Sequence, residues 1–349
     1  MLAWWLAALG LLSGCDKVLG LNRPDVADAS ADASADASAD AGGPSLARWT
    51  AATPLPASRD YNHGHAAFIG DTLYVIGGYE ASGETAVVFR ATFAGELGAW
   101  TQATPLPAPR AFGDVVTIGN RIYVVGGANS GTAQTSVYFG DVGATGDIAS
   151  WAAATPLPAA RKALAAATAN GYLYAYGGGD GSNVRHASVH VARVLATGSL
   201  GAWQVTTSMP APRANFAGVA ARGFLYAIGG DAGDSEAATS TVYVARTDPD
   251  TGNVGPWSTT TPLPTPRANH AVVTDSQHIY VIGGQHLDVS SEVLHSRIGD
   301  DGTLGPWEAN EPLLLPRKRH AAVLANGSMF VLGGAPTPTH VERTSQLAP

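Results

Sequence analysis

The stretch WTQATPLPAPRAFGDVVTIGNRIYVVGG, residues 100–127, holds the three markers that decide the fold of this 349-residue chain: a Trp, an Arg ten residues later, and a Gly pair that ends an apolar segment. The markers recur six times in register, about 50 residues apart. The Trp residues are Trp49, Trp100, Trp151, Trp203, Trp257 and Trp307, and the Gly pairs begin at Gly77, Gly126, Gly177, Gly229, Gly283 and Gly333. Self-similarity at this period indicates a repeat architecture.

Each repeat predicts four short β-strands. Apolar residues follow a period of two, as in Leu73–Ile76 and Ile279–Ile282, and no periodic run is long enough for a helix. One strand follows the Arg, one ends at the Gly pair, one lies in the middle of the repeat, and one begins at the Trp. Four antiparallel strands repeated at this period predict a blade of a β-propeller.

The order of the segments predicts how the ring closes. The last repeat reaches its third strand at Thr339–Arg343, and a Trp segment from Leu46 to Pro56 precedes the first blade. We therefore expect an all-β domain, residues 45–349, that forms a six-bladed β-propeller of four-stranded antiparallel blades. The N-terminal strand completes the last blade and closes the ring.

The Gly pair that closes an apolar strand, the aromatic residue after it and the Trp, all at this period, resemble the kelch repeat. The resemblance covers Ser45 to about Gln346 and implies a scaffold that serves many functions. Kelch enzymes of the galactose-oxidase type need a Tyr crosslinked to a Cys beside copper. The single Cys, Cys15, lies outside the repeats, so we expect no such centre and no other cofactor.

The composition excludes several functional classes. Hydrophobic residues make up 45% of the chain and charged residues only 14%, which is unlike a disordered protein. The net charge of −8 argues against a nucleic-acid partner, because clustered Lys and Arg bind phosphate backbones. One Cys excludes an intrachain disulfide framework and a Cys-cluster metal site. We expect a monomer with no bound metal.

The first 44 residues carry signals of their own. Residues 1–14 lack charged side chains and have the length of the apolar region of a secretory signal. Leu12-Ser13-Gly14-Cys15 resembles the bacterial lipoprotein box, which implies acyl chains on Cys15 and attachment to a membrane. Residues 15–44, with Ala-Asp-Ala-Ser repeats, have the composition of a solvated linker. The alternative is an ordinary cleaved signal with an accidental Cys.

The six Arg residues at the third marker predict a ring on one face of the propeller. Because strands alternate in direction, the connections that carry the Arg residues lie on the same face as the loops after the Gly pairs. The ring comprises Arg59, Arg110, Arg161, Arg213, Arg267 and Arg317. Such a ring is suited to a carboxylate or an acidic sugar. The alternative is that each Arg ties its blade to the preceding one through backbone carbonyls.

Residues that differ between repeats are further candidates for ligand binding. They are Glu80, Asn129, Asp180, Asp231 and His286 in the loops after the Gly pairs, His63 and His65 before the first strand of the first blade, and His270 and His320 at one equivalent repeat position. For the His residues the alternative is a buried ring bonded to neighbouring backbone. No carboxylate partner for a metal can be assigned to His63 and His65.

The sequence carries neither a Gly-x-Ser-x-Gly motif nor a phosphate-binding loop. We therefore expect a lipid-anchored propeller in the cell envelope, on the outer or inner membrane and facing the periplasm or the cell surface, that binds an unknown protein or saccharide. The alternative comes from the resemblance: six-bladed bacterial kelch proteins include sialic-acid mutarotases and epimerases, which use Arg and acidic residues on the axial face.

Overall fold

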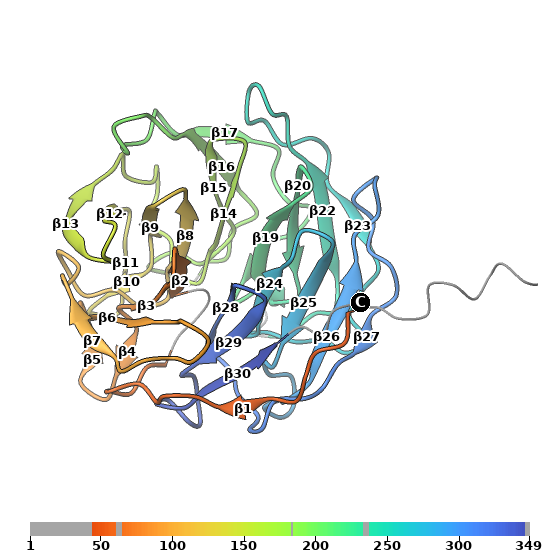
Figure 1. Cartoon of the computed structure of the whole chain (residues 1–349). Helices are drawn as coiled ribbons and strands as arrows, with labels where there is room; N and C mark the ends of the chain where they lie inside the picture. Colours follow the sequence, from red (N-terminus) through yellow and green to blue (C-terminus); the bar gives the residue numbers. More distant parts are fainter. Residues whose placement is uncertain (1–43, 61–64, 183, 233–236, 346–349) are drawn as a thin grey trace, which may run out of the picture. The chain divides into compact units, whose positions relative to one another are not determined.

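Six four-stranded antiparallel sheets follow one another along the chain and close into a ring (Figure 1). The computed structural model describes residues 44–60, 65–182, 184–232 and 237–345, and these contain strands but no helix. The expected all-β, six-bladed propeller is therefore confirmed. Four predicted features lie outside the described residues: the signal predicted for residues 1–14, Cys15, nearly all of the predicted linker, and His63.

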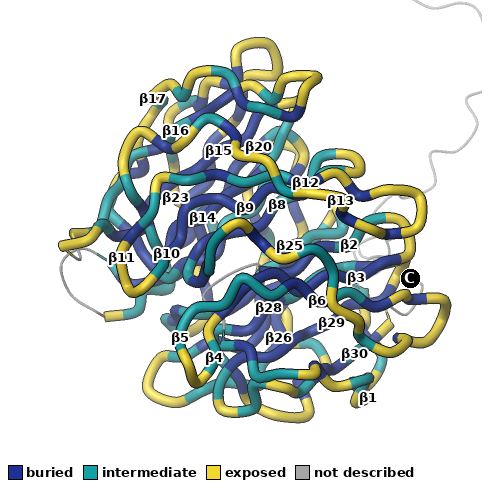
Figure 2. The backbone as a smooth tube through the Cα atoms, turned by 90° about the vertical axis from the view of Figure 1, so that its left-hand side faces the viewer, coloured by how far each residue is buried: buried dark blue, intermediate teal, exposed yellow. Residues whose placement is uncertain are grey.

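The first two strands of each blade lie closest to the axis. The innermost strands, each in contact with its counterparts in neighbouring blades, are β2 (Ala66–Ile69), β8 (Asp114–Ile118), β14 (Ala165–Ala169), β19 (Ala217–Ala221), β24 (Ala271–Thr274) and β28 (Ala321–Ala325). The second strands are β3 (Thr72–Ile76), β9 (Arg121–Val125), β15 (Tyr172–Tyr176), β20 (Phe224–Ile228), β25 (His278–Ile282) and β29 (Ser328–Leu332). The second strands are almost wholly buried, because they lie between neighbouring strands of their own blade and between two adjacent blades (Figure 2).

The outer half of each blade contains the third and fourth strands. The third strands are β6 (Val88–Thr92), β12 (Val137–Val142), β16 (Val189–Arg193), β22 (Val242–Arg246), β26 (Val293–Arg297) and β30 (Val341–Ser345). The fourth strands are β7 (Thr101–Ala103), β13 (Ile148–Ala153), β17 (Gln204–Thr206), β23 (Ser258–Thr260), β27 (Glu308–Ala309) and β1 (Thr50–Ala51). Most of the fourth strands are two or three residues long, which limits the exposed sheet edges.

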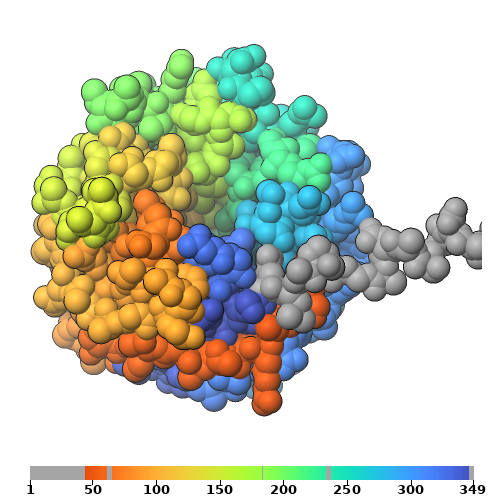
Figure 3. Space-filling view, in the orientation of Figure 1, coloured from red at the N-terminus to blue at the C-terminus, as the bar shows by residue number. Residues whose placement is uncertain are grey.

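The N-terminal strand closes the ring, as the repeat order predicts. Strand β1 pairs with β30, with Thr50 opposite Arg343 and Ala51 opposite Glu342. The Trp49 side chain is 1% exposed, and its indole N–H donates to the carbonyl of Glu311 at 2.9 Å. Blade six, drawn in dark blue, consequently lies against blade one, drawn in orange (Figure 3).

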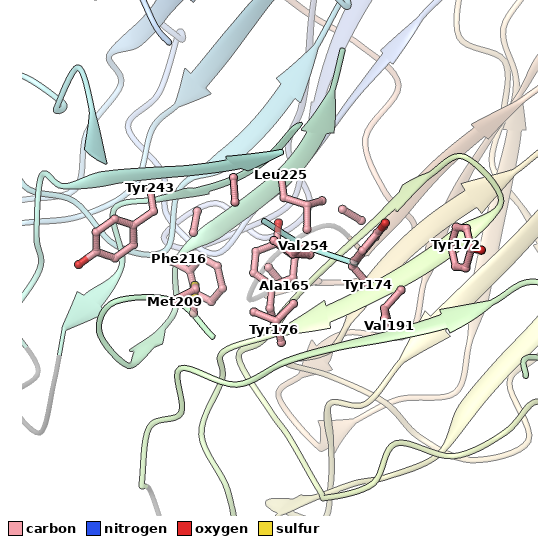
Figure 4. Close-up of a cluster of buried hydrophobic side chains, with 14 residues drawn as sticks. Ala165, Tyr172, Tyr174, Tyr176, Val191, Met209, Phe216, Leu225, Tyr243 and Val254 are labelled. Atoms are coloured by element: carbon pink, nitrogen blue, oxygen red, sulfur yellow. The ribbon is translucent and has the colours of Figure 1, made fainter. Parts of the chain in front are cut away.

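The core of the propeller is divided into six apolar clusters, one between each pair of adjacent blades. Between blades three and four, Tyr174 and Tyr176 of β15 pack near Phe216 and Leu225 of the next blade (Figure 4). The repeated Trp residues lie at the outer rim, where each donates its indole N–H to a connection of the preceding blade. The Trp residues therefore join neighbouring blades.

Three two-stranded ribbons were not predicted. Two of them are hairpins directly after a Gly pair: β4 (Tyr79–Glu80) with β5 (Gly83–Glu84), and β10 (Ala128–Asn129) with β11 (Thr132–Ala133). In the third, β18 (Arg213–Ala214) pairs with β21 (Asp231–Ala232). These ribbons stand on the face that carries the Arg connections, and they form part of the wall of the pocket described below.

Candidate functional site

The six repeated Arg residues are buried between blades, with exposed fractions of 0% to 8%. Three of the guanidinium groups, those of Arg213, Arg267 and Arg317, donate to the first Gly of the Gly pair in their own blade. Arg213 Nη1 donates to the carbonyls of Gly229 at 2.6 Å and Thr241 at 2.9 Å. Arg317 Nη1 donates in the same way to Gly333 at 3.0 Å. These side chains do not line the pocket on this face.

The backbone of each Arg bonds to the preceding blade. The carbonyl of Arg110 accepts the N–H of Gly78 at 2.7 Å, and the carbonyl of Arg59 accepts that of Gly334 at 2.8 Å across the closure of the ring. The same bond recurs at Arg161, Arg213, Arg267 and Arg317. Each Arg therefore joins two blades, its backbone to one and its side chain to the next, which is the geometry of an inter-blade tie.

Three of the six guanidinium groups rest on an aromatic side chain of the third strand. Arg59 lies over Phe89, Arg110 over Tyr138, and Arg213 over Tyr243, with 4.4 to 5.3 Å from the guanidinium carbon to the ring centroid. These are cation–π contacts, which gain strength when they are desolvated. In blade six the equivalent residue is Glu342, which is 0% exposed and forms an ion pair with Arg317 at 2.5 Å.

Leu314 completes the surroundings of the buried Glu342 carboxylate. Its N–H donates to Glu342 at 2.8 Å, and that of Leu315 donates at 3.3 Å. The other five repeats have Pro at the position of Leu314, namely Pro56, Pro107, Pro158, Pro210 and Pro264. Pro has no N–H. Leu314 therefore supplies a backbone donor to the Glu342 carboxylate, which stands where blades one, two and four have an aromatic ring.

Removal of the Arg317 side chain tests this pairing. We expect Arg317→Met to lower the free energy of unfolding by about 3–5 kcal/mol, because a buried carboxylate loses its partner. The double variant Arg317→Met/Glu342→Leu should recover most of that loss, because it removes both charges. Urea denaturation measures the difference. A double variant no more stable than the single variant would contradict the role of Glu342.

Three of the four described His candidates, His65, His270 and His320, are also buried. His65 Nδ1 bonds to the carbonyl of Ile76 at 2.8 Å, and the N–H of Gly113 in blade two donates to His65 Nε2 at 3.1 Å. These bonds hold a neutral ring, and burial lowers the pKa of His65 to about 4. The remaining two, His270 and His320, pack under Gly229 and Gly283 of the preceding blades, and burial lowers the pKa of His320 to about 3.

The loop candidates fall into two groups. Glu80 forms an ion pair with Arg59, Asp180 accepts the N–H of Ser182 at 2.8 Å, and Asp231 accepts the amide of Asn215 at 2.6 Å. These three carboxylates therefore stabilise loops or scaffold. Asn129 is half-buried and His286 is exposed, and neither lines the pocket on this face.

Of the residues two positions after each Arg, the five that the structure describes form the mouth of the axis. All five adopt left-handed backbone conformations with φ of 52° to 57°, and we call them the axial ring: Phe112, Ala163, Asn215, Asn269 and Arg319. From Ala163 to Arg319, the N–H of each member donates to the carbonyl of the preceding member at 2.6 to 3.1 Å. Hydrogen bonds from blade to blade therefore fix these unusual conformations.

A pocket of about 800 Å³ opens at the axial ring. Four ring members, Phe112, Ala163, Asn215 and Arg319, line it. The ribbons and connections of the surrounding blades supply the rest of the lining, which includes Asp60, Tyr79, Glu84, Ser130, Lys162 and Arg185. Five of the six blades therefore contribute to one polar pocket with an aromatic side, on the face where the sequence predicts the ligand.

Several of the predicted loops surround the pocket, but none of the predicted candidates that the structure describes lines it; neighbours of those candidates do. Tyr79 lines the pocket where Glu80 was a candidate, and Ala128 lines it where Asn129 was. One signal was available: the residue two after each Arg differs in every repeat except for the two Asn residues, Asn215 and Asn269. A residue that varies beside an invariant marker is a candidate for contact with a ligand.

A second cavity, of about 300 Å³, lies along the axis between the innermost strands. Asp114 lines it, at the position that Ala165, Ala217 and Ala271 occupy in the next three blades. Burial raises the pKa of Asp114 to about 7, although the N–H groups of Val115 and Ala166 donate to its carboxylate at 2.8 and 2.7 Å.

The raised pKa of Asp114 predicts a dependence of stability on pH. Between about pH 4 and 7 the folded protein holds a proton that the unfolded chain releases, so this group's contribution to stability falls as pH rises, by at most about 1.4 kcal/mol per pH unit. The free energy of unfolding of Asp114→Asn, relative to that of the parent, should therefore rise from pH 5 to pH 8. The pH-independent cost of the amide cancels in that comparison.

Urea denaturation of both proteins at about pH 5 and pH 8 measures the change, which we expect to exceed about 1 kcal/mol. Asp288→Asn, at an exposed loop residue, is the matched control. An Asp114→Asn variant whose stability runs parallel to that of the parent across this range would contradict the raised pKa.

Neither a metal cluster nor a membrane span accompanies the pocket within the described part of the chain. No group of three or more His, Cys, Asp or Glu side chains is placed to hold a metal ion there. No helix of these residues is long and apolar enough to cross a membrane.

Several proteins with kelch in their names match parts of this sequence. Kelch-like protein 33 of Homo sapiens is 32% identical over 144 residues, 40% of this chain and 26% of that protein. Beta-scruin of Limulus polyphemus is 26% identical over 210 residues, 58% of this chain and 22% of that protein. The chain thus spans about a quarter of the length of these relatives. No protein-family model matches the sequence.

Among solved structures, that of YjhT superposes with a TM-score of 0.65 at 16% identity, covering 86% of this chain and 97% of that one. At this identity the likeness shows the fold alone. Together with the six blades and the sequence matches, it supports one assignment: the chain is a kelch-repeat propeller.

Proposed function

We propose that this protein is a binding module of the cell envelope, anchored by lipid on Cys15, and that the pocket at the axial ring receives its ligand, a protein segment or a saccharide. The observation that carries the proposal is the convergence of side chains from five blades on one pocket of about 800 Å³. This volume lies within the range of ligand sites. The repeated Arg and Trp residues maintain the ring, so the pocket residues are free to vary.

Backbone strain in the axial ring supports the same site. A bulky residue at positive φ costs on the order of 1–3 kcal/mol, and such residues cluster at binding sites. Phe112 and Arg319 both have φ of 57°, and both line the pocket. The fold therefore accepts strain at residues whose side chains face the pocket.

Substitution of Phe112 separates binding from folding. Because Asn tolerates positive φ, we expect Phe112→Asn to keep the parent's thermal stability while it weakens ligand binding about tenfold or more. A glycan array and a peptide array supply the candidate ligands, and calorimetry measures the affinity. Val205→Ala, on the outer edge of blade three and 69% exposed, is the control. Equal binding by the parent and Phe112→Asn would place the ligand elsewhere.

Sialic-acid mutarotase activity is a second candidate function, because Asp60 and Glu84 share the pocket with Arg185 and Arg319. Carboxylates can move protons while guanidinium groups hold an acidic sugar. The same Phe112→Asn and parent samples can be added to freshly dissolved N-acetylneuraminic acid and followed by NMR. Accelerated interconversion of the anomers that is lost in Asp60→Asn or Glu84→Gln would favour the enzyme.

The lipid anchor is a proposal from Leu12-Ser13-Gly14-Cys15. Multiple acyl chains give stable membrane attachment, where a single chain is marginal. We expect the full chain, expressed in a bacterium, to fractionate with membranes and Cys15→Ala to move to the soluble fraction. Ser13→Ala, which keeps the Cys, is the matched control. Membrane association that persists in Cys15→Ala would count against the anchor.

A further inference from the structure

The pocket has an aromatic side, formed by Tyr79 and Phe112. Their rings lie 5.9 Å apart, centroid to centroid, and are tilted by 58°. Tyr79 follows the Gly pair of blade one and is 39% exposed. The same position holds a small residue in the next two blades, Ala128 and Gly179. An exposed aromatic ring in a pocket offers a flat apolar face to a ligand.

Two of the three cations in the pocket are paired with carboxylates. Arg319 Nη1 lies 3.4 Å from Asp60 Oδ2. Arg185 Nη2 lies 3.9 Å from Asp231 Oδ2, which also accepts the amide of Asn215. Both pairs connect different blades, so each carboxylate holds its guanidinium in place at the wall of the pocket.

The third cation, Lys162, and the carboxylate of Glu84 bond to the backbone of the same residue, Gly131. The ammonium group of Lys162 donates to the carbonyl of Gly131 at 3.4 Å, and the N–H of the same Gly131 donates to Glu84 at 2.9 Å. The Lys and the Glu therefore flank a single residue. The three cations are thus balanced by Glu84, Asp60 and Asp231, of which Asp231 pairs with Arg185 from outside the pocket lining.

This balance bears on the charge of the ligand. An anionic or cationic ligand would have to displace one partner of a pair or place an uncompensated charge in the pocket, and both are costly. A neutral ligand with many hydroxyl groups avoids that cost, because hydroxyl groups donate to carboxylates and accept from guanidinium groups without adding a net charge to the pocket. The six repeated Arg residues, which would favour an acid, are buried in the scaffold.

We infer that the pocket binds an uncharged saccharide, with one sugar face on Tyr79 and Phe112 and its hydroxyl groups on the paired side chains. The inference rests on the proposed function, since it names the ligand class of the same pocket. Hydroxyl groups both donate and accept, which suits walls that present carboxylates, guanidinium groups and the amide of Asn215 together.

A glycan array with neutral and acidic members tests the ligand class on the full chain. We expect neutral oligosaccharides to bind and acidic ones, including N-acetylneuraminic acid and galacturonic acid, to bind at least about tenfold more weakly. Affinity for the neutral ligand should change less than about twofold between about 20 and 500 mM NaCl, because no net charge is paired on binding.

Two variants locate the binding. Tyr79→Ala should lower the affinity for the neutral saccharide about tenfold or more, because it removes the aromatic ring on which the sugar stacks. Leu287→Ala, in the blade-five loop, 84% exposed and outside the pocket lining, should bind as the parent does.

Tight, salt-sensitive binding of an acidic sugar that Arg319→Ala abolishes would overturn the neutral class and leave the proposed function standing. A peptide ligand lost in Tyr79→Ala would do the same. An array without any ligand that depends on Tyr79 would overturn both the inference and the proposed site.

Discussion

The propeller depends on the contact between a Gly pair and the Arg of the next repeat. At Gly77 the backbone has φ of 61°, and a Cβ atom there would lie 2.4 Å from the carbonyl oxygen of Arg110. Only Gly therefore permits the approach in which the N–H of Gly78 bonds to that carbonyl. A single blade cannot bury both of its faces, so this junction, repeated six times, sets the spacing at which the six apolar clusters form.

Closure shows how far this junction tolerates local change. Between blades six and one the backbone tie is the usual one, from Gly334 to Arg59, although the two segments lie at opposite ends of the domain. Within blade six Glu342 supports the Arg317 side chain, where blades one, two and four have an aromatic ring, and Leu314 stands where the other repeats have Pro. The two changes are coupled by physics: a buried carboxylate needs donors, and Pro has none.

The sequence was sufficient for the fold because the markers that recur in register are the residues of the junction itself. It was less informative about the pocket. Along a two-residue ribbon successive side chains point to opposite sides, so Glu80 contacts Arg59 whereas Tyr79 lines the pocket. The left-handed conformation of Phe112 was equally hidden, since no Gly or Asn marks it and hydrogen bonds between blades impose it. His65 has a ligand-like residue type but bonds to backbone on both ring nitrogens.

The axial ring explains how repeats with the same backbone geometry place different side chains around one pocket. Each member follows an Arg whose position is fixed by two blades, so its backbone is placed without regard to its own side chain. Small Ala163, amide-bearing Asn215 and charged Arg319 therefore occupy geometrically equivalent positions around one pocket. The hydrogen bonds from ring member to ring member offset the strain at the bulky members. Specificity can then change by substitution at the ring and the ribbons, while the Arg and Gly residues that hold the blades together remain untouched.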